Sequence, residues 1–485
     1  MLVSILTLFY GLFFGEGAAK LFRDSDTGWH ILTGEAILKG GPLPRTDPYS
    51  FTMAGKPWLA WEWGADVWMG AAHRWNGLPG VAVMYAALVA VCAWLWFRLH
   101  AAVGGNFFFA CAMASPMLTT VSLHWLARPH VFSWLLCLLA LIALERAGGQ
   151  LRLWHMAAWF LGGVVWANLH ASFFLLPILC FTYAAGALLR RLLWAEAVSA
   201  TKFVWFAVLS STGTFLNPYG FGLHRHVVEY LSNRELLARV GEFQTFNFQV
   251  EGAGQVLLTV VIGMLGVTLT LARRRPEHFL ICCGMLILGL RSARALPLVA
   301  LLVLPLVNGA ITRALGNVQV RPKIRNIIDS FLAYSGRLRI LERQCGGYAI
   351  APLAFLVAVA LLGTPAFSAR AGFSPTEFPV QAAFEVEKLP QDARLLAPDK
   401  FGGYLIYRFG GQRRVFFDGR SDFYGVGFLK NYVKLIEVRP GWREQAQQFG
   451  FTHALLPNRY SLVAALEHWG WRKIYSDETA TLLGK

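Results

Sequence analysis

Charged residues are scarce in this chain of 485 residues. Asp, Glu, Lys and Arg together make up 15% of it, whereas hydrophobic residues make up 56%. The mean hydropathy is +0.46. Ordinary soluble domains carry about 25% charged residues. The composition therefore argues against a soluble protein and predicts an integral membrane protein.

Acidic residues are fewer than basic ones, 28 against 44, which gives a formal net charge of +16. In a soluble protein this excess would suggest nucleic acid as a partner. Here much of the basic charge lies in short loops between apolar runs, as in the cytoplasmic loops of membrane proteins. We therefore expect the lipid bilayer as a partner and no nucleic acid.

Cysteine is also sparse, with seven residues, and six of them lie inside apolar runs. No disulfide framework and no paired zinc-ligand motif is visible in their spacing. The sequence also lacks a phosphate-loop or dinucleotide fingerprint. An internal repeat, which is frequent in transporters, is not found either.

Long apolar runs, by contrast, are abundant. A membrane-spanning helix needs about 20 apolar residues, and the sequence predicts about eleven such spans. The fold class expected is an α-helical multi-pass membrane protein, with a transmembrane domain over residues 1–366 and a small extracytoplasmic α/β domain over residues 367–485. The predicted spans are 2–19, 79–97, 105–122, 130–145, 154–169, 172–189, 203–216, 254–272, 278–290, 295–312 and 347–364.

Basic residues fall in alternate loops, which predicts the orientation. The loops with Arg98, Arg146, Arg190 and Arg274 and the basic stretch 313–343 share one side, which is cytoplasmic if positive charge stays inside. The N-terminus is then inside and residues 367–485 are outside. Two long loops, 20–78 and 217–253, also face outward. The localisation expected is a bacterial cytoplasmic (inner) membrane.

An acidic cluster opens the first outer loop. Asp24 and Asp26 stand two residues apart, and His30 follows four residues after Asp26, on the same face of a predicted helix over residues 24–39. An outward carboxylate pair can bind a divalent cation or act as a general base. One of the two aspartates can instead cap the helix.

This loop carries a resemblance. The pattern DSDTGWHILTGEAIL, then LPRTDPYSFT, then GKPWLAWEW resembles the type C glycosyltransferases (GT-C), and looks like a bacterial branch of membrane glycosyltransferases. The class includes protein O-mannosyltransferases and oligosaccharyltransferase catalytic subunits. The resemblance implies a lipid-phosphate-linked sugar donor and an acidic residue of the first loop that acts at the acceptor. It carries over to Asp24 and Asp26.

Other polar residues at the outer ends of the predicted spans complete a candidate site. Arg291 and Arg294 are three residues apart and Arg128 precedes a span, so all three are candidates for binding the donor phosphate; the alternative is arginines that only extend to the interface. His170, at a tight corner between spans, and Glu242, in the second loop, are candidate metal or substrate residues with His30, although a lone histidine is more often structural. A divalent metal, Mg or Mn, is left open as a cofactor.

The polar C-terminal region reads as alternating strands and helices. Strands are predicted in ARLLAPD, GGYLIYRF, RRVFFDGR, FTHALLPN and KIYSDETATLL. Tyr404, Asp418 and Arg420 are candidates on the acceptor side, although an Asp–Arg surface pair explains the last two as well. The region resembles the outer domain of oligosaccharyltransferase subunits but lacks their Trp-Trp-Asp motif, which argues against recognition of a peptide acceptor.

Together these features predict a membrane glycosyltransferase. It would transfer a sugar from a polyprenyl-phosphate-linked donor to a glycan, lipid or protein acceptor outside the membrane, with Asp26 as the first choice of base and Asp24 as the second. The alternative is a non-enzymatic transporter of lipid-linked glycans or a scaffold for envelope assembly. The absence of a repeat and the position of the polar groups at span ends favour the enzyme.

Overall fold

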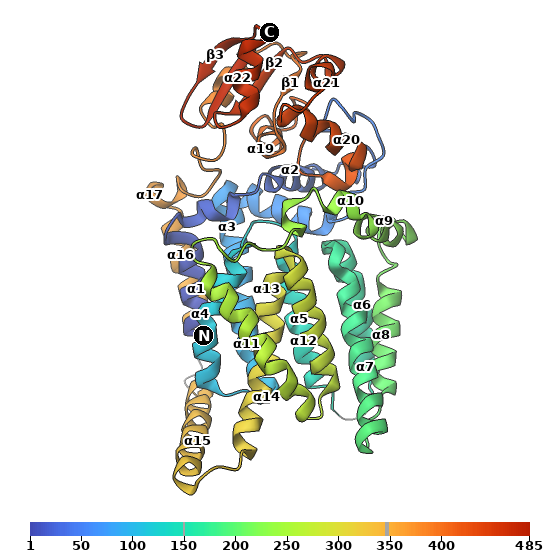
Figure 1. The fold of residues 1–485 in the computed structure, drawn as a ribbon, viewed down its shortest axis with the longest axis vertical. Coiled ribbons are helices and arrows are strands. Elements are labelled where there is room, and N and C mark those ends of the chain that lie inside the picture. The colour runs from blue at the N-terminus through green and yellow to red at the C-terminus, as the bar shows by residue number, and fades with distance from the viewer. Residues whose placement is uncertain (149–150, 345–348) are drawn as a thin grey trace.

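The computed structural model describes residues 1–148, 151–344 and 349–485. Most helices run along the long axis of the molecule as a bundle, and the C-terminal region, shown in red, lies at one end of it (Figure 1). Between the bundle and this region, α2 (Asp26–Leu38) and the first part of α3 (Trp63–Ala102) lie across the bundle end.

Helices overlap all of the predicted spans. Four of them, among the described residues, are long and apolar enough to cross a membrane: Trp63–Ala102, Ala171–Trp194, Ala253–Ala272 and Ala293–Asn317. The count of eleven spans therefore stays a prediction, and the first residues of the span 347–364 lie outside the described ranges. The other bundle helices are α1 (Leu2–Phe13), α4 (Phe107–Ser122), α5 (His130–Glu145), α6 (Leu153–Leu169), α8 (Thr201–Gly213), α12 (Pro276–Arg291) and α16 (Ile350–Leu362).

Two of these stretches are composite. Ala171–Trp194 joins a short turn, η2 (Ala171–Phe174), to α7 (Leu175–Trp194), and Ala253–Ala272 is α11. Ala293–Asn317 begins with three short helical turns and continues as α14 (Leu304–Asn317). The three turns are η4 (Ala293–Ala295), α13 (Leu296–Leu298) and η5 (Val299–Val303).

A break inside α3 separates an interfacial part from a spanning part. Asn76 and Gly77 have non-helical backbone angles, and the φ of +58° at Gly77 favours glycine. Pro79 begins the second part, where its missing N–H costs no hydrogen bond. The Trp-rich segment before the break therefore turns across the bundle end, as the sequence predicts for a helix lying in the interface.

Glycines bring α2 and α3 into close contact. A Cβ atom on Gly34 would lie 1.8 Å from the backbone oxygen of Asp66, and one on Gly70 would lie 2.5 Å from the backbone nitrogen of Glu35. No side chain fits at either crossing point. This packing sets His30, one turn before Gly34, directly against Asp66.

The second outer loop is built from short helices. They are α9 (Phe221–Ser232), α10 (Arg234–Leu237) and η3 (Gly241–Phe243), and they lie at the same end of the bundle as α2 (Figure 1). At the opposite end projects α15 (Pro322–Gln344), the basic stretch of the sequence (Figure 1). The basic helix and the C-terminal region thus occupy opposite ends of the molecule, in the arrangement that the loop charges predict.

The C-terminal region contains a four-stranded sheet in the order β1-β2-β4-β3. Strand β1 pairs with β2 in parallel, and β4 pairs antiparallel with both β2 and β3. Its elements are α17 (Pro365–Ser368), α18 (Ala382–Glu387), β1 (Leu395–Leu396), α19 (Asp399–Arg408), α20 (Ser421–Ile436), α21 (Trp442–Phe449), β2 (His453–Pro457), α22 (Ser461–His468), β3 (Arg472–Ser476) and β4 (Ala480–Gly484).

Two of the predicted strands are wrong. The segment GGYLIYRF forms most of helix α19, and RRVFFDGR makes only an isolated bridge between Val415 and Ser50 of the first outer loop. The apolar residues of α19 form a continuous run in the sequence, and residues 401–406 are buried around the helix. Gly403 sits where a Cβ atom would lie 2.5 Å from Ser25 Oγ, so this glycine lets α19 pack on α2 rather than bind a ligand.

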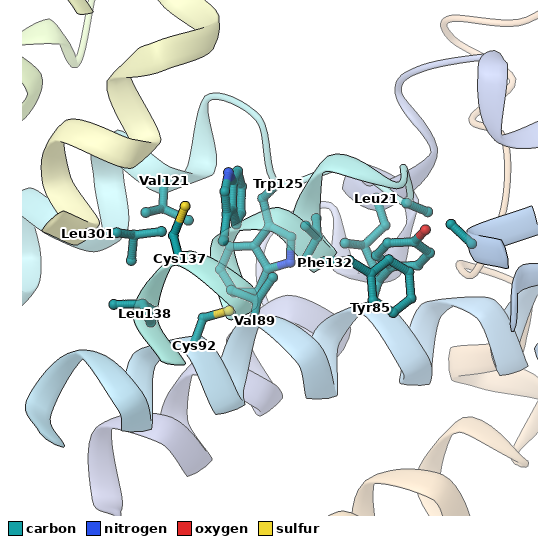
Figure 2. Close-up of a cluster of buried hydrophobic side chains, with 14 of the residues drawn as sticks. Leu21, Tyr85, Val89, Cys92, Val121, Trp125, Phe132, Cys137, Leu138 and Leu301 are labelled. Carbon is teal, nitrogen blue, oxygen red and sulfur yellow. The ribbon is translucent and has the colours of Figure 1, made fainter. Parts of the chain in front are cut away.

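A continuous apolar core extends from the bundle to the C-terminal region, and includes Phe378 and Phe401. One part of it lies beneath the loop between α4 and α5, where Trp125 is directed towards Phe132 and Cys137 (Figure 2). Trp125 is fully buried, and a Cβ atom on Gly11 would lie 2.8 Å from its ring. The packing of Trp125 therefore fixes the loop that carries Arg128.

Candidate functional site

Arg128 lies among three carboxylates at the outer-loop end of the bundle. Its Nη1 is 2.8 Å from Asp24 Oδ2 and 3.7 Å from Glu242 Oε2, and its Nη2 is 2.9 Å from Asp26 Oδ2. Glu242 also forms an ion pair with Arg294. We call these five residues the carboxylate–arginine cluster. Four segments that are distant in the sequence thus meet at this cluster.

The two aspartates have different local roles. Asp26 is the first residue of α2, and its backbone N–H donates to Asp24 Oδ1 at 2.9 Å. Asp24 therefore satisfies one of the free N–H groups at the start of the helix. The Asp26 side chain makes no such capping bond and is directed to Arg128. The capping alternative thus accounts for one oxygen of Asp24 and does not account for Asp26.

Hydrogen bonds on both sides of Ala127 hold Arg128 in place. The Ala127 backbone N–H donates to Leu21 O at 2.8 Å, and Thr27 Oγ1 donates to Ala127 O at 2.9 Å. The loop before α5 is thereby tied to the segment that carries Asp24 and Asp26. Pro129 then starts α5 immediately afterwards.

Glu242 and Arg294 are tied together in the same way. Ser292 Oγ donates to Glu242 O at 3.1 Å, and the Ala293 N–H donates to Gln244 O at 2.8 Å. These two hydrogen bonds therefore hold the turn after α12 against the turn η3. Arg291, one turn earlier on α12, is exposed. The structure therefore brings Arg294 and Arg128 together and leaves Arg291 outside the cluster.

Burial and charge set the protonation of these carboxyls. Burial, with the neighbouring Asp24 carboxylate, raises the pKa of Asp26, and Arg128 opposes this rise. Burial also disfavours the charged form of Glu242, but Arg294 and Arg128 outweigh it and its pKa is lowered. A carboxylate with a raised pKa is a stronger base, so Asp26 suits proton abstraction better than Glu242 does.

The carboxylate–arginine cluster does not present a free set of metal ligands. Each of its three carboxylates has an oxygen facing an arginine, and Asp24 accepts a backbone N–H with its other oxygen. Among the residues that the structure describes, no group of three His, Cys, Asp or Glu side chains is arranged to hold a metal ion. The residues present therefore fit a guanidinium better than a metal.

A second titratable group lies around Glu62, the residue before α3. Glu62 Oε1 is 3.3 Å from His170 Nε2, and Glu62 Oε2 is 3.7 Å from His30 Nε2. On the side of the ring away from Glu62, His30 Nδ1 is 2.5 Å from Asp66 Oδ1. The corresponding atom of the other ring, His170 Nδ1, is 2.9 Å from Ser133 Oγ. All these side chains are largely buried. His30 and His170, predicted as separate candidates, thus flank one carboxyl.

One hydrogen bond assigns the proton of the His170 imidazole. Burial lowers the pKa of His30 and His170, so both rings are neutral. The Ser172 N–H donates to His170 Nδ1 at 3.2 Å, which leaves the ring proton on Nε2, facing Glu62. His30 Nδ1 shares a hydrogen bond with Asp66 Oδ1. The Nε2 atoms of both rings are buried beside Glu62 and form no hydrogen bond with any of the described residues.

Burial raises the pKa of Glu62 to about 7, although Arg128 and Arg294 oppose the rise. The group can thus store or deliver a proton near neutral pH. The sequence analysis missed Glu62 and Asp66 as site residues. Their i,i+4 spacing in the motif AWEWGAD, at the start of a helix, is the signal that would have identified them.

The C-terminal region contacts the carboxylate–arginine cluster through Gly419. A Cβ atom on Gly419 would lie 2.0 Å from Asp26 Oδ1. Its neighbours Asp418 and Arg420 are buried and form an ion pair, and Arg420 also bonds Asp47 of the first outer loop at 2.8 Å. The predicted acceptor-side residues Asp418 and Arg420 thus join the two outer segments, and Tyr404 lies in the apolar core.

No protein-family model matches the sequence, and no curated protein matches it. Solved structures do match. The apo oligosaccharyltransferase of Archaeoglobus fulgidus aligns with a TM-score of 0.54 and 11% sequence identity, over 94% of this chain and 68% of that one. The same enzyme in complex with Zn and sulfate aligns with a TM-score of 0.55 and 12% identity, over 94% and 67% of the two chains. The chain thus has the oligosaccharyltransferase fold, as the sequence resemblance to this class predicts.

Proposed function

We propose that this protein is a membrane glycosyltransferase that uses a polyprenyl-phosphate-linked sugar. The observation that carries the proposal is the convergence of Asp26, Arg128 and Arg294 at the bundle end that adjoins the C-terminal region. A base and two phosphate-binding cations are the groups that this transfer requires. The oligosaccharyltransferase fold supports the assignment.

The proposed reaction has one displacement step. Asp26 takes the proton from the acceptor hydroxyl or amide as its heteroatom attacks the anomeric carbon. The bond from that carbon to the phosphate oxygen breaks, and the phosphate leaves with the electron pair. Arg294 and Arg128 stabilise the negative charge that develops on the leaving phosphate, a task for which the planar guanidinium is well shaped.

A cavity near this site supports a lipid-linked donor. It is an open groove with a volume of about 550 Å³, lined mostly by apolar residues of α6 and of the loop that follows α8. Trp63, beside Glu62, also lines it, and its Nε1 donates to Asn168 Oδ1 at 2.8 Å. A polyprenyl chain can enter such a cavity from the membrane while its phosphate stays at the headgroup level. The lining residues are Trp63, Val164, Val165, Asn168, Phe215, Leu216, Asn217 and Pro218.

Turnover of the natural donor by purified protein tests the proposal. Lipids extracted from cells that lack the protein should contain its unused donor. Incubation of this extract and an envelope fraction with the purified wild type should release polyprenyl phosphate, and Asp26→Asn should slow the release by roughly 10²–10⁴-fold. Asp392→Asn, which changes an exposed carboxylate, serves as the control. Release at equal rates with and without the protein would rule out the enzyme and leave the transporter or scaffold.

A further inference from the structure

The guanidinium of Arg128 occupies the point at which three carboxylates meet, where a metal ion could otherwise bind. Three carboxylates approach its guanidinium from two separate segments, Asp24 and Asp26 from the start of α2 and Glu242 from η3. The side chain of Arg128 is only 15% exposed, so water screens these charges weakly. Without the guanidinium, the three carboxylates would repel one another across a partly buried space. The positive charge at this point therefore stabilises the convergence of these segments.

A metal ion cannot share this position with Arg128. The N–H groups of the guanidinium point at carboxylate oxygens that a divalent ion would need as ligands. Arg294 takes the other oxygen of Glu242. An added dication would also lie beside two guanidinium groups and be repelled by both. The arginine and the metal are therefore alternatives at the carboxylate–arginine cluster.

We propose that Arg128 is a built-in cation that replaces a divalent metal at this site. The wild type then binds no divalent ion at the cluster, and the loss of the guanidinium converts the three carboxylates into a metal site. The part of this inference that concerns catalysis, a metal-independent transfer, rests on the proposed function. The part that concerns metal binding does not, because it needs no substrate.

Mn²⁺ binding to purified protein tests the exchange directly. The signal of free Mn²⁺ in electron paramagnetic resonance should fall on titration of Arg128→Ala, with about one ion bound per chain and an affinity at least tenfold higher than that of the wild type. The same ion should raise the melting temperature of Arg128→Ala and leave that of the wild type unchanged, because a ligand stabilises the folded state that binds it.

Two further variants make the result specific. Asp24→Asn added to Arg128→Ala removes one ligand and should abolish the gained binding. Arg128→Lys keeps a positive charge and should remain insensitive to Mn²⁺, and it also serves if Arg128→Ala does not fold. Stoichiometric Mn²⁺ binding by the wild type that Asp24→Asn or Asp26→Asn removes would overturn the proposal. So would an Arg128→Ala protein that folds and gains no Mn²⁺ binding.

Donor turnover gives the catalytic part of the test. A chelator such as EDTA should leave turnover by the wild type unchanged, and Mn²⁺ should partly restore turnover by Arg128→Ala. Loss of wild-type turnover with EDTA, recovered by added Mn²⁺, would overturn the metal-independent mechanism. If no donor turns over under any condition, the proposed function fails, whereas the Mn²⁺ titration still decides the role of Arg128.

Discussion

Glu62 illustrates how neighbours decide the chemistry of a single residue. The imidazoles of His170 and His30 lie on either side of its carboxyl, at 3.3 and 3.7 Å. Burial raises the pKa of Glu62 to about 7. A group of this kind can exchange protons at physiological pH, and it lies on the same outer segment as Asp26.

Replacement of Glu62 by Gln should change how stability depends on pH. The pKa of Glu62 is 4.5 when unperturbed and about 7 in the folded protein, so the fold favours the protonated form. Its stabilising contribution is complete below pH 4.5 and is lost as pH rises to 7, by at most about 3 kcal/mol. Gln has nearly the same shape and does not ionise, so Glu62→Gln should gain stability relative to the wild type over this range.

Melting temperatures of both proteins in detergent, measured from pH 4.5 to 7.5, give the comparison. Glu478→Gln, which changes an exposed carboxylate, should follow the wild type throughout. A constant difference between Glu62→Gln and the wild type across this range would show that Glu62 ionises normally in the folded protein.

The two arginines after α12 should differ in their effect on donor binding. Arg294 faces Glu242 within the carboxylate–arginine cluster, whereas Arg291 is exposed. Loss of charged hydrogen bonds, each worth about 1.5–3 kcal/mol, should weaken binding of polyprenyl phosphate to Arg294→Ala roughly tenfold or more. Arg294→Lys should also bind more weakly, because it lacks the planar fork. Arg291→Ala is the matched control, and equal affinities for all of these proteins would place the donor phosphate elsewhere.

At the scale of elements, the contact between the loop before α20 and the start of α2 determines where the Asp26 carboxylate lies. Gly419 lies so close to Asp26 that a methyl group there must displace the carboxylate. A displacement of about 1 Å can reduce catalysis 10²-fold. We therefore expect Gly419→Ala to lower donor turnover at least tenfold while the protein still folds. Gly427→Ala, also in the C-terminal region, meets open space and should keep full turnover; equal turnover by both variants would contradict this role of the contact.

The elements also show which features the sequence can predict. The helices of the bundle follow from long apolar runs, and α2 follows from the apolar face of residues 24–39, because these patterns are local. The mistaken strand at α19 has a different cause. Its two glycines and short apolar run suggest a strand, but the glycines are required by contacts with Phe417 and Ser25, which are distant in the sequence. Likewise, Arg128 was predicted to bind phosphate, and only the fold places it against Asp24, 104 positions away.

At the scale of the whole molecule, the basic helix α15 lies at one end of the bundle, away from the C-terminal region at the opposite end (Figure 1). The predicted topology places α15 in the cytoplasm and the C-terminal region outside. The carboxylate–arginine cluster would then face the outer leaflet, where a lipid-linked sugar and an extracytoplasmic acceptor can meet.

Cysteine labelling in intact cells tests this topology. In a variant without the seven native cysteines, Glu478→Cys should react with a membrane-impermeant maleimide, because it is exposed in the C-terminal region. Arg274→Cys, exposed in a basic loop, should react only after the membrane is permeabilised. Labelling at position 274 and protection at position 478 would reverse the orientation and remove the carboxylate–arginine cluster from the outer face.

The central claim, that this protein transfers a sugar with Asp26 as the base, is tested most directly by mass spectrometry of envelope glycans. Cells without the protein, cells with the wild type and cells with Asp26→Asn at equal expression should be compared. We expect one glycosylated species to be present only with the wild type, and the lipid-linked donor to accumulate in the other two strains. An identical glycan profile in all three strains, or a full profile with Asp26→Asn, would contradict the account.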